Sequence, residues 1–299
     1  APEDFKNTSA NFTNVTFIIV DGKLNIAQRK VLMTSADDEK VYDGTPLTNS
    51  TVTVTGDGFA EGEGAAYTVT GSQTEVGESN NSFTYKLNDN TKASNYTITP
   101  EYGKLKVNPV TDEVIVTITE NSGSAKYDGT EKTVTGYEVT SISDPLYKEG
   151  DFTFSGDATI KGTDADTYDM NLAPGDFKNT NGNFKNVRFV INDGTLVISP
   201  RTLTITSGSD SKEYDGTPLT SSEIKVTGDG FVDGEGASYT FTGSQLDVGS
   251  SKNTFDYRLN DNTKAKNYEI TKEYGDLTVT AVSTQIVITA NSKTEVYSG

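Results

Sequence analysis

The feature that most constrains this chain is a long internal repeat. Residues 29–108 align with residues 201–280 without a gap, and 51 of the 80 aligned positions are identical. At the same offset, residues 1–28 align with residues 173–200, with 17 of 28 positions identical. Because self-similarity at a fixed period is the signature of repeat architectures, we expect small units in series rather than one large core.

Two distantly related units, A and B, alternate within this period. Both contain a Tyr-Asp-Gly turn near their start and close with a Gly-x-Leu-x-Val/Ile segment. The predicted organisation is the C-terminal half of a B repeat (1–28), a first A repeat (29–108), a complete B repeat (109–200), a second A repeat (201–281) and the start of another B repeat (282–299). The simplest interpretation is a window from a longer array. The alternative, in which the incomplete repeats of neighbouring chains meet head to tail, stays open.

The composition excludes several kinds of chemistry. The 299 residues include no Cys and no His, so disulfides, His/Cys metal sites, Ser-His-Asp triads and Cys nucleophiles are ruled out. A net charge of −18 disfavours nucleic acid and anionic membranes as partners, and no apolar run is long enough for membrane insertion. Carboxylate pairs that could act as acid and base are all duplicated with the repeat, so we predict neither an enzyme nor a cofactor.

Alternation of polar and apolar residues predicts strands throughout. Thr51–Thr55 reads T-V-T-V-T, Ala66–Thr70 reads A-Y-T-V-T, and Val114–Thr119 reads V-I-V-T-I-T. This period of two is typical of antiparallel strands with one buried face. With six or seven short strands per unit, the predicted class is all-β, as tandem small Ig-like β-sandwiches in an extended array. A β-grasp-like module stays open as the alternative, since Pro174–Val187 could hold one irregular helical turn.

The recurring Tyr-Asp-Gly turn is the strongest local motif. Glycine can adopt the positive φ that other residues resist, and an Asp side chain can cap a turn. Tyrosine can bury its ring while its hydroxyl group reaches a backbone carbonyl. We therefore predict a structural anchor, with a ligand-contacting aromatic at the domain edge as the alternative. The residues concerned are Tyr42, Asp43, Gly44, Tyr127, Asp128, Gly129, Tyr214, Asp215 and Gly216.

Acidic residues suggest a calcium site as a further hypothesis. Calcium takes six to eight oxygen ligands, several of them carboxylates. The candidate ligands recur in both A repeats and are Asp57, Glu61, Glu63, Asp229, Asp233 and Glu235. Their spacing matches no EF-hand or nonapeptide repeat, and the alternative is a solvated acidic rim that keeps the protein soluble.

An internal amide cross-link between Lys and Asn is another hypothesis for a chain without Cys. It needs a Lys on one strand, an Asn on a neighbouring strand and a carboxyl group to move the proton. The repeated candidates are Lys40 with Asn95 and Lys212 with Asn267. Loss of one ammonia per bond in an intact-mass measurement would reveal it.

The motifs resemble the tandem YDG/MBG-type repeats of large bacterial cell-surface proteins, mostly of Gram-positive, gut-type bacteria. The A repeat carries K-V-Y-D-G-T-P-L-T at Lys40–Thr48 and T-G-D-G-F at Thr55–Phe59. The B repeat, with G-T-D-A-D-T-Y at Gly162–Tyr168 and N-F-K-N-V at Asn183–Val187, is similar to the partner repeat that alternates with it there. The resemblance implies an extracellular, surface-anchored adhesin in which such modules form the stalk.

The expected function is therefore that of a structural stalk or spacer in a surface adhesin or fibre. Pro109 and Pro200 at the repeat boundaries restrict the backbone and predict short, stiff linkers. The expected partners are further copies of the same repeats in cis, with host glycan or protein bound through other domains. The second hypothesis is that these modules themselves bind host glycan or protein.

Overall fold

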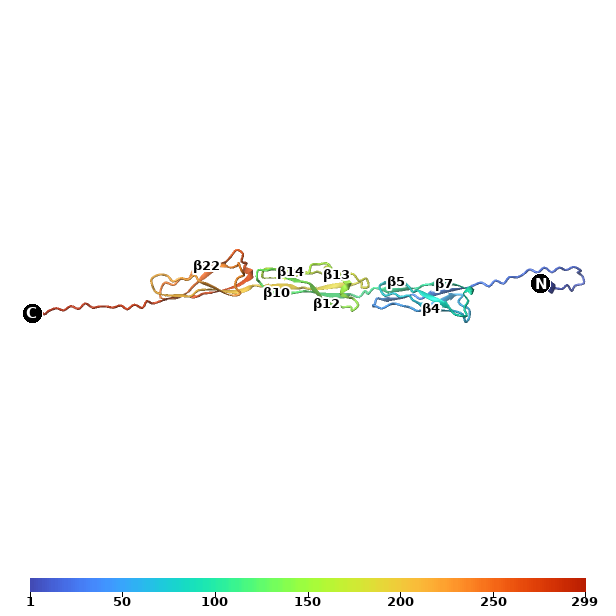
Figure 1. Ribbon diagram of the computed structural model, residues 1–299, viewed down its shortest axis with the longest axis horizontal. Helices are drawn as coiled ribbons and strands as arrows, with labels where there is room; N and C mark the ends of the chain where they lie inside the picture. The colour runs from blue at the N-terminus through green and yellow to red at the C-terminus, as the bar shows by residue number, and fades with distance from the viewer. The chain divides into compact units, whose positions relative to one another are not determined.

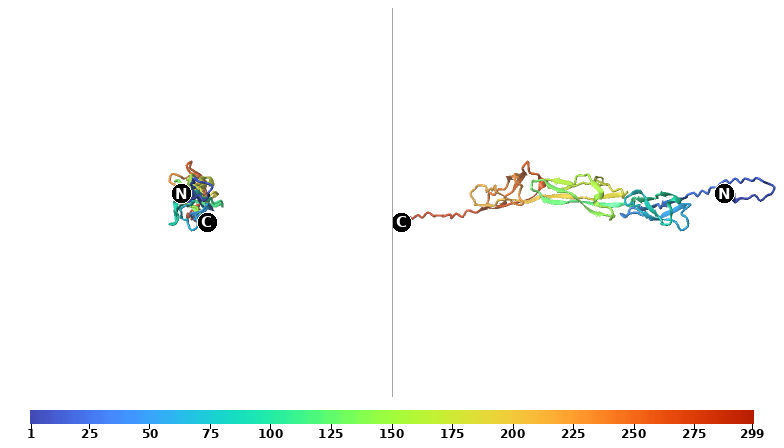
Figure 2. Two further views of the ribbon diagram at one scale, coloured as in Figure 1. Left: turned by 90° about the vertical axis from the view of Figure 1, so that its right-hand side faces the viewer. Right: turned by 45° about the vertical axis from the view of Figure 1, so that its right-hand side comes forward.

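The computed structural model describes all 299 residues, and its regular secondary structure is almost entirely β-strand (Figure 1). Its helical elements are five 3₁₀ turns: η1 (Pro2–Asp4), η2 (Ala93–Asn95), η3 (Glu149–Asp151), η4 (Pro174–Asp176) and η5 (Ala265–Asn267). The predicted all-β class is confirmed. The helix that a β-grasp module requires is absent, because Pro174–Val187 holds only η4, a three-residue strand and the first residue of a further strand. The first strand begins at Arg29 and the last ends at Thr280, and Figure 2 shows no strand outside these bounds.

The chain divides into two compact units. Unit 1 comprises Ala1–Glu113 and Asn181–Asn186, and unit 2 comprises Val114–Thr180 and Val187–Gly299. Unit 1 thus contains the first A repeat and one loop that belongs by sequence to the B repeat. Unit 2 contains the rest of the B repeat and the second A repeat. The division between compact units therefore does not follow the repeat boundary.

The first A repeat forms two three-stranded sheets and one two-stranded sheet. Its strands are β1 (Arg29–Ser35), β2 (Asp38–Val41), β3 (Val52–Gly56), β4 (Ala65–Val69), β5 (Gly77–Asn80), β6 (Phe83–Leu87), β7 (Tyr96–Glu101) and β8 (Lys104–Asn108). Strand β1 pairs with β3 antiparallel and with β7 parallel, while β8 pairs with β5 antiparallel and with β2 parallel. Strands β4 and β6 pair antiparallel. The first and last segments of the repeat therefore run in parallel through both sheets.

The second A repeat has the same topology as the first. Its strands are β19 (Arg201–Ser207), β20 (Asp210–Glu213), β21 (Ile224–Gly228), β22 (Ala237–Phe241), β23 (Gly249–Lys252), β24 (Phe255–Leu259), β25 (Tyr268–Glu273) and β26 (Asp276–Thr280). The sheet orders are β21-β19-β25 and β20-β26-β23, with β22 paired to β24. The registers also correspond, because Val31 pairs with Ile98 in one copy and Leu203 with Ile270 in the other.

The B repeat follows the same plan with more pairing. Its strands are β9 (Val114–Glu120), β10 (Gly123–Lys126), β11 (Lys132–Thr135), β12 (Tyr137–Ile142), β13 (Phe152–Phe154), β14 (Thr159–Gly162), β15 (Asp166–Asp169), β16 (Phe177–Asn179), β17 (Val187–Asn192) and β18 (Thr195–Ser199). The orders β12-β9-β17 and β10-β18-β15 match those of the A repeats. A paired β11 and β14 stand where the first A repeat has a single bridge between Leu47 and Gln73.

Each repeat has a narrow core of its own. Alternate residues of the central strands point inward, as the period-two pattern requires. Their fully buried members include Val31, Met33, Leu105, Val107, Val116, Ile118, Leu196, Ile198, Leu203, Ile205, Leu277 and Val279. The B repeat adds an aromatic cluster around Phe177, whose ring lies 5.0–6.0 Å from those of Tyr137, Phe152, Phe154 and Phe189.

A glycine precedes the closing strand of every repeat for a steric reason. A Cβ atom on Gly103 would lie 2.5 Å from the backbone carbonyl oxygen of Ala36. The Gly103 N–H donates a hydrogen bond to the buried Ser35 hydroxyl group at 3.0 Å. The equivalent glycines, Gly194 and Gly275, make the same close approach to backbone. The Gly-x-Leu motif therefore marks a place where two backbone segments touch.

Candidate inter-repeat joints

Each Tyr-Asp-Gly turn is closed by its own Asp side chain. In the first A repeat, Oδ1 of Asp43 accepts hydrogen bonds from Nζ of Lys40 (2.6 Å) and from the backbone N–H (2.9 Å) and hydroxyl group (2.7 Å) of Thr45. The bond from Lys40 holds the pKa of the Asp43 carboxyl well below its usual range. Gly44 has a φ of +76°, which only glycine adopts readily. The same arrangement recurs around Asp215, whereas at Asp128 the lysine is Lys132, which follows the turn and bonds to Oδ2.

The tyrosines of these similar turns differ in exposure. Tyr127 is 4% exposed, Tyr42 is half-buried and Tyr214 is 42% exposed. The ring of Tyr127 packs edge-on against that of Tyr268, with centroids 5.7 Å apart. Its hydroxyl group donates to the Glu235 carboxylate rather than to the backbone carbonyl that the sequence led us to expect. Burial of this tyrosine thus comes from the following repeat rather than from its own turn.

Two tyrosine hydroxyl groups share the Glu235 carboxylate. Tyr268 donates to Oε2 of Glu235 at 2.6 Å, and the same hydroxyl group accepts the backbone N–H of Val232 at 3.0 Å. Burial, reinforced by the hydrogen bond to Glu235, raises the pKa of Tyr268 to about 12. The same causes raise the pKa of Tyr127. Both hydroxyl groups therefore stay protonated at neutral pH, as donors to the carboxylate.

Asn267 makes the second contact between the B repeat and the second A repeat. Its fully buried side chain accepts the backbone N–H of Ala165 through Oδ1 at 2.7 Å. Its Nδ2 donates to Oδ1 of Asp164 at 3.1 Å, and Lys264 donates to the other oxygen at 2.7 Å. The bond from Lys264, with that from Asn267, holds the pKa of the Asp164 carboxyl below its usual range. The carboxylate is thus charged and hydrogen-bonded from both sides.

A further ion pair, at β10, joins the B repeat to the second A repeat. Nζ of Lys126, at the end of β10, lies 2.8 Å from Oδ2 of Asp229. The same Oδ2 accepts the backbone N–H of Thr202 at 2.9 Å. The hydrogen bond from Lys126 lowers the pKa of Asp229 to about 2. The charge pair therefore connects the two repeats over most of the pH range.

Acidification should weaken this joint between about pH 4 and pH 2. The pKa of Asp229 is about 2 in the folded protein and about 3.9 in an unfolded chain. Because the folded value is the lower one, the contribution of the ion pair is complete above about pH 4 and is lost as the pH falls through about 2. We expect the thermal midpoint of Asp229→Asn to fall less steeply across this window than that of the unaltered protein.

The control for this measurement is Asp57→Asn in the first A repeat. Asp57 accepts the equivalent backbone hydrogen bond, from Lys30 at 2.8 Å, but pairs with no lysine side chain. Other carboxylates titrate over the same window in both variants, so the difference between the two profiles isolates the Lys126 ion pair. Identical profiles would contradict its role.

A similar set of contacts occurs inside unit 1. Asn183 accepts the backbone N–H of Val76 through Oδ1 at 2.9 Å, and its Nδ2 donates to the Glu75 carboxylate. The ring of Phe184 packs edge-on against Tyr42, with centroids 5.8 Å apart. The Asn181–Asn186 loop thus covers the tyrosine of the first A repeat.

The two joints share one pattern. Each uses an Asn-aromatic pair, Asn183-Phe184 or Asn267-Tyr268. Each pair contacts a receiving site. This site consists of the turn tyrosine and of two consecutive residues, one acidic and one apolar, that directly precede a strand. In the first A repeat the receiving site is Tyr42, Glu75 and Val76, and in the B repeat it is Tyr127, Asp164 and Ala165. The amide side chain binds one backbone N–H and one carboxylate in both cases, which fixes its orientation.

The calcium candidates are not brought together. No group of three or more acidic residues in the structure is positioned to hold a metal ion, and this includes Asp57, Glu61, Glu63, Asp229, Asp233 and Glu235. Glu63 instead accepts the hydroxyl group of Tyr96, as Glu235 accepts that of Tyr268. These two carboxylates serve as hydrogen-bond acceptors for protein groups.

The cross-link candidates lie at opposite ends of their repeats. Lys40 pairs with Val107 in β8 and bonds to Asp43, whereas Asn95 precedes β7. In the second A repeat, Nζ of Lys212 lies 2.7 Å from Asp215. Asn267 is held by Asp164 and Ala165, as described above. Neither lysine therefore meets its proposed asparagine.

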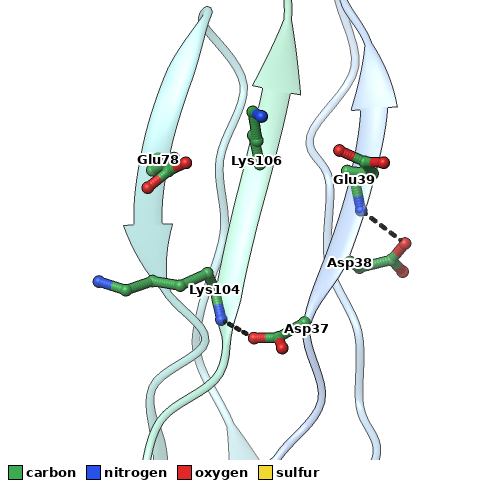
Figure 3. A pocket seen from close by; sticks show the side chains of 6 residues that line it. All are labelled: Asp37, Asp38, Glu39, Glu78, Lys104 and Lys106. Atoms are coloured by element: carbon green, nitrogen blue, oxygen red, sulfur yellow. Dashed lines mark hydrogen bonds between the residues drawn. The ribbon is translucent and has the colours of Figure 1, made fainter.

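A charged face distinguishes the first A repeat from the second. A shallow pocket of about 410 Å³ lies over β2, β8 and β5, and Figure 3 shows the six charged residues that line it: Asp37, Asp38, Glu39, Glu78, Lys104 and Lys106. Lys106 lies between Glu39 and Glu78 in the strand register. The equivalent positions of the second A repeat, Ser211, Thr278 and Ser250, carry hydroxyl groups. The two copies thus share the joint residues but differ on this face.

No protein-family model matches the chain, and no curated protein matches it. None of the helical turns has the length and hydropathy that crossing a lipid bilayer demands.

Proposed function

We propose that this chain is a series of structural spacer repeats of the YDG/MBG type, part of the stalk of a bacterial surface adhesin. The observation that carries the proposal is the recurrence of the same joint in both compact units. An Asn-aromatic pair and a receiving site are common to the two, although A and B repeats are otherwise distant in sequence. A module that serves as a spacer needs such a joint because its only necessary contacts are with its neighbours.

The composition of the joints also supports this proposal. In unit 2, only Pro200 lies between β18 and β19, so the backbone passes directly from one repeat into the next. The joint combines a buried amide, two tyrosine hydroxyl groups on one carboxylate and several ion pairs. Directional contacts of this kind hold one repeat in a particular orientation on the next, whereas a flexible linker would only attach the two. That property suits a part that holds another domain at a distance.

We extend the proposal to the architecture of the repeats and to their arrangement along the chain. Two three-stranded sheets and one two-stranded sheet in each A repeat are consistent with a small Ig-like sandwich, and three repeats joined end to end would make an extended array. The resemblance of the Tyr-Asp-Gly motifs to surface repeats supports an extracellular location. The resemblance also supports further copies of the same repeats, in the same chain, as the partners of each repeat.

Small-angle X-ray scattering of the whole chain tests this function. A compact domain of this length has a radius of gyration of about 19 Å. From Arg29 to Val41 the chain is extended, which at about 3.3 Å per residue makes each repeat about 40 Å long. We expect a radius of gyration well above the compact value and a linear cross-sectional Guinier region. A single globular distance distribution would contradict the proposal.

A further inference from the structure

We propose that each repeat is a mechanical clamp, whose first and last segments resist tension along the chain because they are paired in parallel and must slide past each other to separate. The inference goes beyond the spacer function, which concerns distance, to the force that a repeat withstands. It rests on that function only for the origin of the force, since the geometry belongs to each repeat by itself.

The first and last segments of each repeat are paired in one continuous register. In the first A repeat, Arg29 pairs with Tyr96 and Asp38 with Leu105, and the members of both pairs lie 67 positions apart in the chain. The offset is equally constant in the other two repeats. We call these paired segments the terminal ribbon, which consists of residues 29–41 with 96–108, 114–126 with 187–199, and 201–213 with 268–280.

The chain enters and leaves the terminal ribbon at opposite ends. In the first A repeat it enters at Arg29 and leaves at Asn108, which pairs with Val41 at the far end of the first segment. Tension between the preceding and following parts of the chain therefore pulls the two segments in opposite directions along their length. The evenly spaced hydrogen bonds of a parallel pair then share the force, whereas a pair that is peeled from one end loses them in succession.

Core packing also opposes sliding of the two segments. Val31 and Met33 in the first segment, and Leu105 and Val107 in the last, are at most 2% exposed. A slip of one residue would move every such side chain from the core face of the sheet to the solvent face. The barrier to sliding thus includes apolar burial as well as hydrogen bonds, and it is this barrier that sets the rate of forced unfolding.

Side chains bridge the gap between the two strand pairs of each ribbon. In the first A repeat, the Gly103 N–H donates to Oγ of Ser35 at 3.0 Å, and the Lys104 N–H donates to Oδ1 of Asp37 at 2.6 Å. The corresponding acceptors in the other repeats are Glu120 and Ser122, and Ser207 and Ser209. The residue types differ, but in all three repeats two side-chain oxygens of the first segment accept backbone N–H groups of the last. The hydrogen bonds between the segments therefore continue through the gap.

The Tyr-Asp-Gly turn lengthens the terminal ribbon. The backbone N–H of Tyr42 donates to the carbonyl oxygen of Asn108 at 2.8 Å, one residue beyond β2. Tyr127 and Tyr214 make the same bond, at 2.9 Å, with the last residue of the closing strand of their own repeats. The turn thus adds a hydrogen bond at the end of the ribbon from which the chain leaves.

The first test compares two directions of pulling on the first A repeat in variants of the full chain. Because the chain contains no Cys, pairs of introduced cysteines attach handles at defined positions. Gln28→Cys with Asp112→Cys loads the ribbon along its length. Gln28→Cys with Ser94→Cys loads the same ribbon from one end, since the Gln28 side chain donates to the Ser94 carbonyl oxygen at 3.0 Å.

The readout is the mean unfolding force in single-molecule force spectroscopy at one pulling speed. We expect the force along the ribbon to be at least about twice the force from one end, because all hydrogen bonds between the segments must break together. Equal forces in the two directions would overturn the clamp. Because scattering measures the shape of the chain without load, it tests the spacer function separately.

The second test asks whether the bridge across the gap contributes to the clamp. Ser35→Ala removes a bridging hydroxyl group, and Thr91→Val is the matched control. Thr91 is also buried and accepts the Gly64 N–H at 2.8 Å, but it lies outside the ribbon. Equilibrium denaturation of both variants verifies that each folds and measures its loss of stability.

With handles at residues 28 and 112, Ser35→Ala should raise the unfolding rate at a given force about tenfold, the effect of losing one buried hydrogen bond. Thr91→Val should raise it less than about twofold, because the hydrogen bond to Gly64 is still intact when the ribbon separates. Equal acceleration by the two variants would show that Ser35 serves the fold in general, and would overturn the role of the bridge in the clamp.

Discussion

Replacement of Phe177 by alanine is expected to lower the free energy of unfolding of unit 2 by about 3–5 kcal/mol, the usual cost of removing a buried aromatic ring. The side chain is 5% exposed and lies at the centre of the aromatic cluster of the B repeat. Its ring centroid is 5.0 Å from that of Phe154 and 5.4 Å from that of Phe189. Because the cluster draws on β12, β13, β16 and β17, its loss affects pairing in two sheets.

The chain provides a matched control for this substitution. Phe5 occupies the same aligned position in the incomplete B repeat and is 53% exposed, in contact with Phe17 alone among the aromatic rings. Phe5→Ala should change the free energy of unfolding by less than about 0.5 kcal/mol, as for most surface substitutions. Guanidinium denaturation of the whole chain, followed by circular dichroism, measures both. Equal effects would mean that the cluster is not a core.

Sequence periodicity predicted the strands well because alternation is a local property. T-V-T-V-T at Thr51–Thr55 contains most of β3, and V-I-V-T-I-T at Val114–Thr119 lies within β9. The repeat period likewise predicted that both A copies have the same strands. These features depend only on which residues must face inward within each strand.

The alternation of polar and apolar residues could not predict that the first and last strands of a repeat pair in parallel. Alternation favoured antiparallel strands, yet β1 pairs with β7 and β2 with β8 in parallel. The register depends on contacts between residues distant in the chain, such as Leu105 beside Asp38, and the hydrophobic pattern of either strand is compatible with both directions. The reason for the recurring glycine at Gly103 became visible only with this pairing.

The joint residues were noticed in the sequence but given other roles. Glu235 was a calcium candidate and Asn267 a cross-link candidate, because both recur and both carry polar groups suited to those roles. The signal that could have found the joint is the Asn-aromatic pair itself, which occurs at Asn11, Asn95, Asn183 and Asn267. Its partner could not be derived, since the acid-apolar dipeptide is far away along the chain, as Asp164 is from Asn267.

Asn267→Ala should destabilise unit 2 by about 1–3 kcal/mol, the cost of leaving buried polar groups without partners. The substitution removes the acceptor for the Ala165 N–H and a donor to Asp164, both now held at 2.7 and 3.1 Å. Because a free-energy change of about 1.4 kcal/mol is a factor of ten in an equilibrium constant, hydrogen exchange at the Ala165 amide should accelerate by roughly tenfold. That amide reports on the joint itself, whereas the thermal midpoint reports on the whole unit.

The first A repeat supplies the comparison that decides what Asn267 does. Asn95 stands at the same position, before β7 and beside Tyr96, but its side chain is exposed. If the buried amide acts through the joint, Asn95→Ala should leave stability within about 0.5 kcal/mol of the unaltered protein. If instead both substitutions destabilise equally, the asparagine serves the fold of its own repeat, and the shared pattern at the two joints would follow from that fold. Unequal effects, with exchange accelerated at Ala165 alone, would assign the residue to the contact between repeats.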